Sequence, residues 1–300
     1  MKNMLSFTKK ITVPVAVIFF TILSPSAFSQ DLLEGLEEEP TDYAIATFKS
    51  TRVINGHSVE NVAGGVMDFR ISHRFGVLDQ GLYDMFGLDV ATMRLGFEYG
   101  INDKLMVGLG RNTYQKSYDG FVKYKILRQS TGKKNMPVTA TYLGAMTVNT
   151  LKWEDPTREN YFTSRLNYVH QILIGRKFSS STSIQLSPTL VHRNLVTSTA
   201  YKNDVFAIGI GGRQKINNRV SFNAEYFYVL PNQIDPTYKN SLSVGFDIET
   251  GGHVFQLHFT NSTPQIEKGF ITETTGSWLK KGIHFGFNIS RVFTVGKRTN

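Results

Sequence analysis

After its first thirty residues, the chain is a series of short segments in which every second residue is apolar. In the segment 241–249, Leu242, Val244, Phe246 and Ile248 alternate with serine, glycine, aspartate and glutamate. Successive side chains of a strand point to opposite faces, so each such segment has one apolar and one polar surface. About a dozen of them, with no helical pattern between, predict a transmembrane antiparallel β-barrel, apolar toward lipid and polar toward its lumen.

The alternation predicts an all-β chain of about twelve strands, and the segment boundaries leave ten to fourteen open. The strands are expected near residues 64–75, 90–100, 105–112, 117–128, 137–149, 162–177, 183–196, 203–215, 220–230, 239–249, 253–261 and 283–295. A tilted transmembrane strand needs about 9–11 residues, which most of these segments supply. An even strand number returns both ends of the barrel to one side of the membrane.

The connections between these segments alternate in length. Long connections follow odd-numbered strands at 76–89, 150–161, 197–202, 231–238 and 262–282, and tight ones lie at 101–104, 179–182, 217–218 and 250–252. Two connections depart from this rule, since 112–116 is short and 129–136 is long. Long loops on one side and short turns on the other are typical of outer-membrane barrels. A secreted β-sandwich or β-solenoid is the soluble alternative.

The two faces of each strand have different compositions. The expected lipid-facing residues are Met93, Leu95, Phe97, Tyr99, Leu242, Val244, Phe246, Ile248, Phe255, Leu257, Phe259, Phe285, Phe287 and Ile289. Pro188 lies inside the seventh strand. A closed barrel has no free edge to accommodate a residue without an N–H donor, so this proline predicts a bulge or an interruption of the strand.

The opposite face carries charge. The lumen-facing candidates are Asp68, Arg70, Arg94, Glu98, Lys123, Lys125, Arg165, Arg193, Arg213, Glu225, Asp247, Glu249 and His258. Buried charges must pair or be hydrated. A lumen zipped shut by arginine–carboxylate pairs is one reading of this set. A water-filled passage with a mild preference for anions is the other, and the sequence leaves both open.

The N-terminal region predicts export. Lys2, Lys9 and Lys10 precede an apolar run from Ile11 to Leu23, and small residues follow, so residues 1–29 are expected to be a secretory signal peptide.

Four further divisions of the chain follow the signal peptide. Residues 30–43 are an acidic segment, expected in the periplasm as a solvated tail or a docking peptide. Residues 44–62 predict a β-hairpin that precedes or starts the barrel, because Asn55-Gly56 is typical of a type I′ turn. The barrel itself is expected over 63–295, and 296–300 is a C-terminal tail.

Composition adds little chemistry to this picture. The chain has no cysteine and a formal net charge of +9, but its basic residues are scattered along strands, which argues against nucleic-acid binding. No Gly-x-Ser-x-Gly motif and no histidine pair at metal-binding spacing is present. We expect no enzyme, cofactor or metal. A base and nucleophile assembled across strands near His258 and His284 is the remaining alternative.

Four stretches carry a resemblance to a known family. They are residues 48–58, 68–76, 130–137 and 246–257. Together they resemble an uncharacterised family of outer-membrane β-barrel proteins from Bacteroidota, over nearly all of the chain after the signal peptide. The resemblance implies an outer-membrane barrel and export, and it implies no activity, ligand or catalytic residue.

The sequence therefore predicts a barrel of the bacterial outer membrane, acting as a narrow pore or transporter for small polar or anionic solutes. The alternative is a plugged barrel that acts as an interaction scaffold through its long loops or acidic N-terminal segment. Expected partners are outer-membrane lipid, the barrel-assembly machinery and a periplasmic protein, and no nucleic acid is expected.

Overall fold

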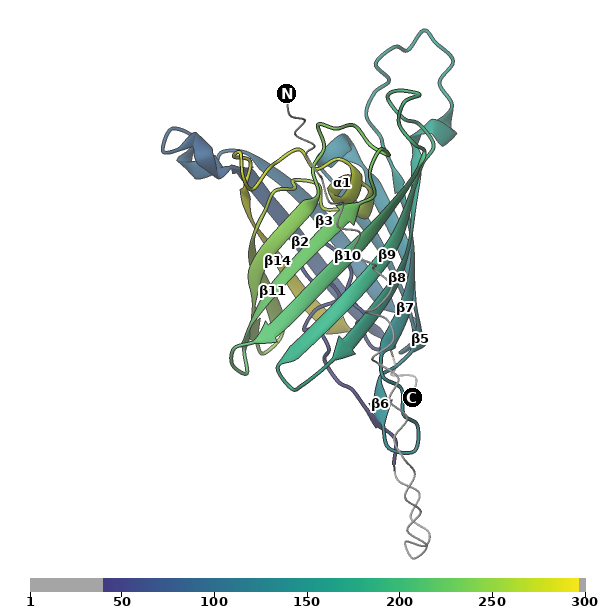
Figure 1. Cartoon of the computed structure of the whole chain (residues 1–300), viewed down its shortest axis with the longest axis vertical. Coiled ribbons are helices and arrows are strands. Elements are labelled where there is room, and N and C mark those ends of the chain that lie inside the picture. The colour runs from purple at the N-terminus through teal and green to yellow at the C-terminus, as the bar shows by residue number, and fades with distance from the viewer. Residues whose placement is uncertain (1–39, 297–300) are drawn as a thin grey trace, which may run out of the picture. The chain divides into compact units, whose positions relative to one another are not determined.

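The computed structural model describes residues 40–296, and within them twelve strands form one closed antiparallel barrel (Figure 1). The wall strands are β2 (Val66–Val77), β3 (Ala91–Gly100), β4 (Leu105–Asn112), β5 (Tyr118–Leu127), β7 (Thr139–Val148), β8 (Leu166–Lys177), β9 (Thr182–Arg193), β10 (Asp204–Lys215), β11 (Val220–Val229), β12 (Ser241–Thr250), β13 (His253–Thr260) and β14 (His284–Thr294). Each wall strand pairs with the next, and β14 pairs with β2 to close the ring. The predicted fold class and strand number are confirmed.

The other elements are short. β1 (Asp42–Tyr43) and β6 (Ser130–Thr131) form a separate two-stranded sheet, and α1 (Glu267–Thr272) is an α-helix of six residues. Four 3-10 turns lie in the connections: η2 (Leu78–Gln80), η3 (Met85–Gly87), η4 (Tyr114–Lys116) and η5 (Phe162–Arg165). No helix in residues 40–296 has the length and apolar character needed to cross a membrane.

The wall is apolar outside and polar inside. In β3, Leu95 and Phe97 are 37% and 51% exposed, whereas Arg94 and Glu98 on the opposite face are 2% and 0% exposed. This is the inverse of a soluble protein, in which large apolar side chains are the buried ones. The alternation read from the sequence thus separates a lipid-facing surface from a buried polar lumen.

The long connections lie at one end of the barrel. We call it the long-loop end, and the opposite end, with the tight turns, is the short-turn end (Figure 1). The connection between β5 and β7 is the exception, because it is long and lies at the short-turn end. Part of it forms β6, which pairs with β1. The extra length of this connection therefore allows it to pair with the N-terminal segment.

Pro188 interrupts one strand pair. The pairing of β8 with β9 includes Gln171 opposite Thr189 and resumes at Ile174 opposite Leu186. The register is the same on both sides of the gap, so there is no bulge, and β9 itself continues through Pro188, which pairs with Ile208 of β10. The expected bulge or interruption of the strand is therefore wrong, because the missing N–H donor of Pro188 interrupts only the pairing with β8.

The N-terminal segment folds into the barrel instead of extending its wall. We call residues 44–63 the plug. From β1 the plug runs into the lumen, turns where the Val53 N–H donates to the Gly56 carbonyl at 2.8 Å, and returns to the short-turn end before β2. Neither Asn55 nor Gly56 has a positive φ, so the expected type I′ geometry is wrong. A Cβ at Gly56 would lie 2.8 Å from the Phe227 ring, so close packing accounts for the glycine.

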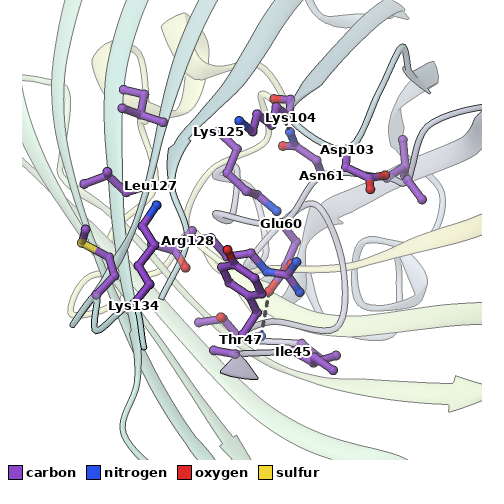
Figure 2. Close-up of a pocket in the computed structure, with 18 residues that line it drawn as sticks. Ile45, Thr47, Glu60, Asn61, Asp103, Lys104, Lys125, Leu127, Arg128 and Lys134 are labelled. Atoms are coloured by element: carbon purple, nitrogen blue, oxygen red, sulfur yellow. Dashed lines mark hydrogen bonds between the residues drawn. The ribbon is translucent and has the colours of Figure 1, made fainter. Parts of the chain in front are cut away.

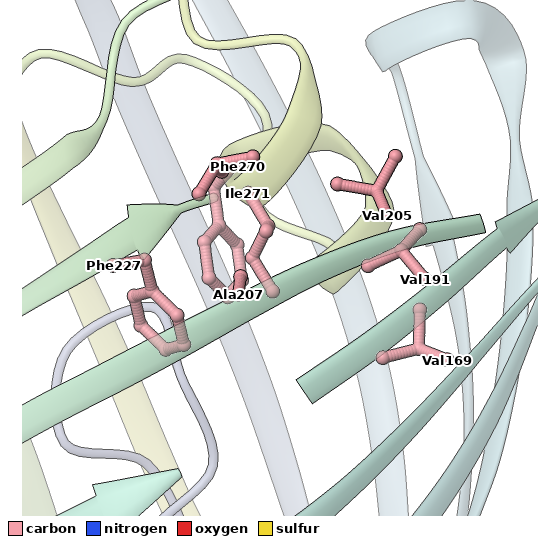
Figure 3. Close-up of a cluster of buried hydrophobic side chains, with 8 residues drawn as sticks. Val169, Val191, Val205, Ala207, Phe227, Phe270 and Ile271 are labelled. Atoms are coloured by element: carbon pink, nitrogen blue, oxygen red, sulfur yellow. The ribbon is translucent and has the colours of Figure 1, made fainter. Parts of the chain in front are cut away.

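A second segment enters the lumen from the long-loop end. We call residues 262–276, in the connection from β13 to β14, the lid. It includes α1, and Figure 3 shows Phe270 and Ile271 of this helix against Val191, Val205 and Phe227 of the wall. All six residues of α1 are buried, including Glu267 and Lys268. The plug and the lid therefore fill the barrel from opposite ends.

Candidate functional site

The structure places most of the predicted lumen residues on the buried inner face. Asp68, Arg70, Arg94, Glu98, Lys123, Arg193, Arg213, Glu225, Asp247 and His258 are all at most 7% exposed. Lys125 and Glu249 lie nearer the short-turn end and are partly exposed. Arg165 lies instead in η5, where it stacks 3.8 Å from the Trp153 ring and donates to the Leu151 carbonyl, so it belongs to the long loops.

The tip of the plug is held by a single carboxylate of the wall. Glu225 on β11 accepts hydrogen bonds from three consecutive backbone N–H groups, of Ile54 at 3.1 Å, Asn55 at 2.8 Å and Gly56 at 3.1 Å. A turn inside the lumen has no neighbouring strand to satisfy its N–H donors. Glu225 supplies that acceptor, and its own burial is offset by the same bonds.

Other wall side chains bond the carbonyls and the side chain of the tip. Asn288 donates to the Ile54 carbonyl at 2.9 Å, and Gln256 donates to the Val53 carbonyl at 3.1 Å. Arg74 donates to the Asn55 side chain at 2.6 Å, and that side chain donates to Ser243 at 2.8 Å. The tip is thus bonded to several strands around the ring.

An ionic cluster lies beside the entering arm of the plug, just before its turn. Arg52 of the plug pairs with Glu98 of β3 at 2.9 Å, and Thr51 donates to the same carboxylate at 2.5 Å. Arg70 of β2 pairs with Asp68 at 2.9 Å and also donates to Thr51 at 2.9 Å. The plug arginine therefore completes a cluster that the wall alone would leave with unbalanced charge.

The neck of the plug, near the short-turn end, is held by cations. Lys177 donates to the Ile45 carbonyl at 2.6 Å, and Arg213 donates to the Ala46 carbonyl at 3.1 Å. Lys123 donates to the carbonyl of Glu60 on the returning arm. These three wall cations therefore donate hydrogen bonds to backbone carbonyls of the plug rather than pairing with its carboxylates.

Wall glycines leave space for the plug. A Cβ at Gly211 would lie 3.7 Å from the Cβ of Val53, and one at Gly175 would lie 3.5 Å from the Cβ of Val59. Phe48, Val53 and Val59 of the plug also form an apolar cluster with Leu173. Gly211 therefore leaves room on the wall for the Val53 side chain of the plug.

The plug and the lid meet at one polar contact. His57 Nε2 lies 3.3 Å from a Glu267 carboxylate oxygen, and His57 Nδ1 lies 2.6 Å from the Arg52 guanidinium. Burial, and then the charge of Arg52, hold the pKa of His57 well below its usual range, while burial raises the pKa of Glu267. Both shifts favour the neutral forms.

The lid carries its own polar contacts at the long-loop end. Lys268 pairs with Glu273, which also accepts a hydrogen bond from the Tyr114 hydroxyl at 2.9 Å. Thr263 and Gln265 bond to Thr92 on β3, at 3.2 and 3.0 Å. The lid therefore reaches from β3 to the apolar wall of β8–β11.

Two cavities flank the plug neck. The larger, which we call the vestibule, has a volume of about 530 Å³ and is lined by both arms of the plug and by the ends of β4 and β5 with their connections (Figure 2). The smaller has a volume of about 310 Å³ and lies between the plug and the β2, β13 and β14 side of the wall. Open space in the barrel thus remains at the short-turn end.

The described residues show no reactive pairing around the inward histidines. His284 Nδ1 lies 3.0 Å from the Phe75 carbonyl, and neither His258 nor His284 is bonded to a serine or threonine hydroxyl between residues 40 and 296. Over the same residues, no cluster of three histidine, aspartate or glutamate side chains could hold a metal ion.

Sequence reasoning missed the two segments that fill the lumen. The plug tip has no strand alternation, and its serine, threonine, arginine and asparagine residues have the composition of an exposed loop. The Asn55-Gly56 turn was the one local signal. Nothing in the local sequence shows that the acceptor for this turn is Glu225, more than 160 positions away.

Comparison with known proteins places the chain in a family. Residues 48–293 match the family described as membrane bound beta barrel domain (DUF5777), and the chain belongs to that family. The predicted family resemblance is confirmed at this level, and an origin in Bacteroidota stays a prediction. No curated protein sequence matches the chain.

Several solved outer-membrane proteins have similar structures at low sequence identity. The NanC porin is 10% identical with a TM-score of 0.46, over 76% of this chain and 98% of its own. The KdgM porin is 9% identical with a TM-score of 0.46, over 76% and 99%. OmpT, an outer membrane protein of Vibrio cholerae, is 10% identical with a TM-score of 0.38, over 77% and 99%.

Proposed function

We propose that this protein is a gated pore of the bacterial outer membrane, which passes small polar or anionic solutes only when the plug is displaced. The observation that carries the proposal is the polar bonding of the plug tip inside a polar wall, above all the three N–H groups held by Glu225. Hydrogen bonds of this kind can be exchanged for bonds to water, whereas an apolar core cannot be hydrated without a large cost.

The wall behind the plug suits a water-filled passage. With the plug removed, Arg70, Glu98 and Glu225 would line the lumen and could be hydrated. The buried inward face also carries two further carboxylates and five further cations, which are Asp68, Asp247, Arg74, Arg94, Lys123, Arg193 and Arg213. The excess of cations supports a preference for anionic solutes.

The topology supports an orientation in the membrane. Periplasmic turns of outer-membrane barrels are short and extracellular loops are long. We therefore assign the short-turn end, with β1 and the plug neck, to the periplasm, and the lid to the cell exterior. A periplasmic partner that binds the acidic segment before the plug would then have a direct mechanical connection to it.

A reversible disulfide tests the proposal. Replacing both Val53 and Gly211 with cysteine places two thiols on Cβ atoms about 3.7 Å apart, within the range that disulfides occupy. The natural chain has no cysteine, so no other thiol competes. We expect the oxidised variant to give no discrete conductance steps in a planar bilayer, and the reduced variant to give transient openings. The Val53→Cys single variant is the matched control and should behave the same under both conditions.

A deletion series separates the plug from the lid. A chain lacking residues 44–63 should conduct more persistently than the full chain. Deletion of 262–275 joins Asn261 to Gly276, which already touch through a 3.0 Å hydrogen bond. A folded barrel that lacks both segments and still gives no conductance would overturn the pore. That result would instead support a plugged barrel acting as an interaction scaffold.

A further inference from the structure

The vestibule contains four cations that have no ion-pair partner among residues 40–296. Lys104, Lys125, Arg128 and Lys134 line it. No carboxylate between residues 40 and 296 lies within ion-pair distance of any of the four. Their neighbours at this end differ, because Lys177, Arg213 and Lys123 already donate to carbonyls of the plug.

The two carboxylates that line the vestibule are already used by the backbone. Glu60 accepts hydrogen bonds from the N–H groups of Thr47 at 2.7 Å and Phe48 at 3.4 Å, which ties the two arms of the plug together (Figure 2). Asp103 accepts a bond from the Gly64 N–H at 3.0 Å. The two lining carboxylates therefore balance only part of the positive charge of the vestibule.

Arg128 is held without using its donors. Its guanidinium lies 4.8 Å from the centre of the Tyr43 ring, a stacking contact that leaves the N–H groups free. Lys125 is partly buried on β5 beside the apolar side chains of Val62 and Leu127. A cation in such a site gains most from a charged ligand, because less water screens the interaction.

We propose that the vestibule is a binding site for small organic polyanions, such as a di- or tricarboxylate, held by Lys104, Lys125, Arg128 and Lys134. Its volume of about 530 Å³ lies in the range of small-molecule sites. The proposal names the solute class of the proposed pore and in that respect rests on it. Because the plug forms one wall of the site, a bound anion would lie next to the segment that must move.

Isothermal titration of the folded barrel in a neutral detergent tests the site, with citrate as the probe and glucose as the neutral comparison. We expect citrate to bind with an affinity that falls as salt is added, and glucose not to bind. The Lys104→Gln, Lys125→Gln double variant should bind citrate at least roughly tenfold more weakly. The Lys134→Gln single variant, which changes only an exposed loop residue, should weaken binding in the same direction.

The matched control is the Lys152→Gln, Lys280→Gln double variant, which removes the same charge from exposed positions of the long loops. It should bind citrate within about twofold of the natural chain, because exposed distant charges are screened. Absence of citrate binding, or equal loss in the two double variants, would overturn the site.

The disulfide variant that fixes the plug to the wall tests the binding site and the pore separately. Citrate binding to the Val53→Cys, Gly211→Cys variant, together with no conductance in either its oxidised or its reduced state, would support the site and reject the pore. Conductance after reduction without any citrate binding would support the pore and reject the site.

Discussion

The plug and the lid both fill the lumen, but they satisfy their backbones in different ways. The lid contains a turn of helix, in which the Phe270 N–H donates to Ile266 and the Glu273 N–H donates to Gly269. The plug has no helical turn, and its arms are joined by backbone bonds from the Val53 N–H to Gly56 and from the Ser58 N–H to Thr51. The N–H groups at its tip bond instead to wall side chains, notably Glu225, and the Ile54 carbonyl accepts from Asn288.

This difference decides what holds each segment in place. The lid needs only a surface for its apolar side chains, and Phe270 and Ile271 pack in the largest apolar cluster on the inner wall. The plug needs particular donors and acceptors at particular positions. A single wall carboxylate should therefore control the plug, whereas only loss of apolar contact area should release the lid. Three substitutions can break or sharpen this comparison.

The largest effect is expected from Phe270→Ala in the lid. Phe270 is 0% exposed and packs edge to face on Phe227, with ring centres 5.1 Å apart. Truncating such a side chain should weaken lid docking by about 3 kcal/mol. Trypsin cleavage after the buried Lys268 should then become faster by roughly two orders of magnitude, as measured by mass spectrometry of the fragments.

Phe162→Ala is the control for this lid variant, because Phe162 is an exposed phenylalanine in η5. It should leave cleavage after Lys268 unchanged. Cleavage after Arg52 should also change little in Phe270→Ala. An equal rise at Arg52 and Lys268 would mean that plug and lid open as one unit, which contradicts the comparison.

A smaller effect is expected from Glu225→Gln in the wall. The amide keeps the shape of the carboxylate but has one oxygen instead of two and no charge, so three N–H donors compete for weaker acceptors. The plug should lose about 2 kcal/mol of docking free energy. This corresponds to an increase of roughly thirtyfold in the population of barrels with an open plug. Trypsin cleavage after Arg52 should accelerate by that factor, while cleavage after Lys268 stays as it was.

Glu249→Gln is the matched control for Glu225→Gln. Glu249 also binds the plug, through Lys49, but its side chain is 41% exposed at the barrel rim. Exposed pairs contribute little, at most about 1 kcal/mol. If Glu249→Gln released the plug as much as Glu225→Gln, then net charge rather than the bonding of the tip would hold it.

The same comparison explains how far the sequence could lead. Strand alternation is a local pattern, so all twelve wall strands and the inward position of residues such as Glu98 could be predicted. The prediction for Arg165 is wrong because strand β8 begins at Leu166, whereas Phe162–Arg165 form a 3-10 turn in which Arg165 stacks on Trp153. The alternation of apolar and polar residues does not show whether the residues next to a strand belong to the strand or to a turn.

A filled lumen was one of two alternatives, but which segments fill it could not be predicted, because this depends on contacts made only after the barrel closes. The plug tip carries polar residues typical of a solvated loop, and Glu267 and Lys268 are charged residues in a buried helix. Their burial is compensated by partners far away in the sequence, such as His57 for Glu267. The polar composition of these segments therefore shows that they form hydrogen bonds and ion pairs, but it wrongly suggests that their partner is solvent rather than the barrel wall.

The smallest expected effect is a pH dependence of the plug alone, through His57. The groups that face this histidine are Arg52 and Glu267, and the charges of Lys123, Arg94 and Arg70 act on it from the wall. Burial and these cations lower its pKa in the docked plug below the value near 6.5 that a released plug would have. Docking is therefore favoured above pH 6.5 and weakens as the pH falls toward the lowered pKa.

Hydrogen exchange of the amides of residues 53–58 measures this effect, with the His57→Gln variant at each pH as the reference so that intrinsic exchange rates cancel. Glu267 has a raised pKa and acts in the opposite direction, but it is present in both chains. We expect exchange of the natural plug to rise several-fold relative to His57→Gln between pH 7.5 and 5.5, and exchange of α1 amides to rise less. A pH response of equal size in the plug and the lid would show that their single polar contact couples them, and the two segments would then have to be treated as one gate.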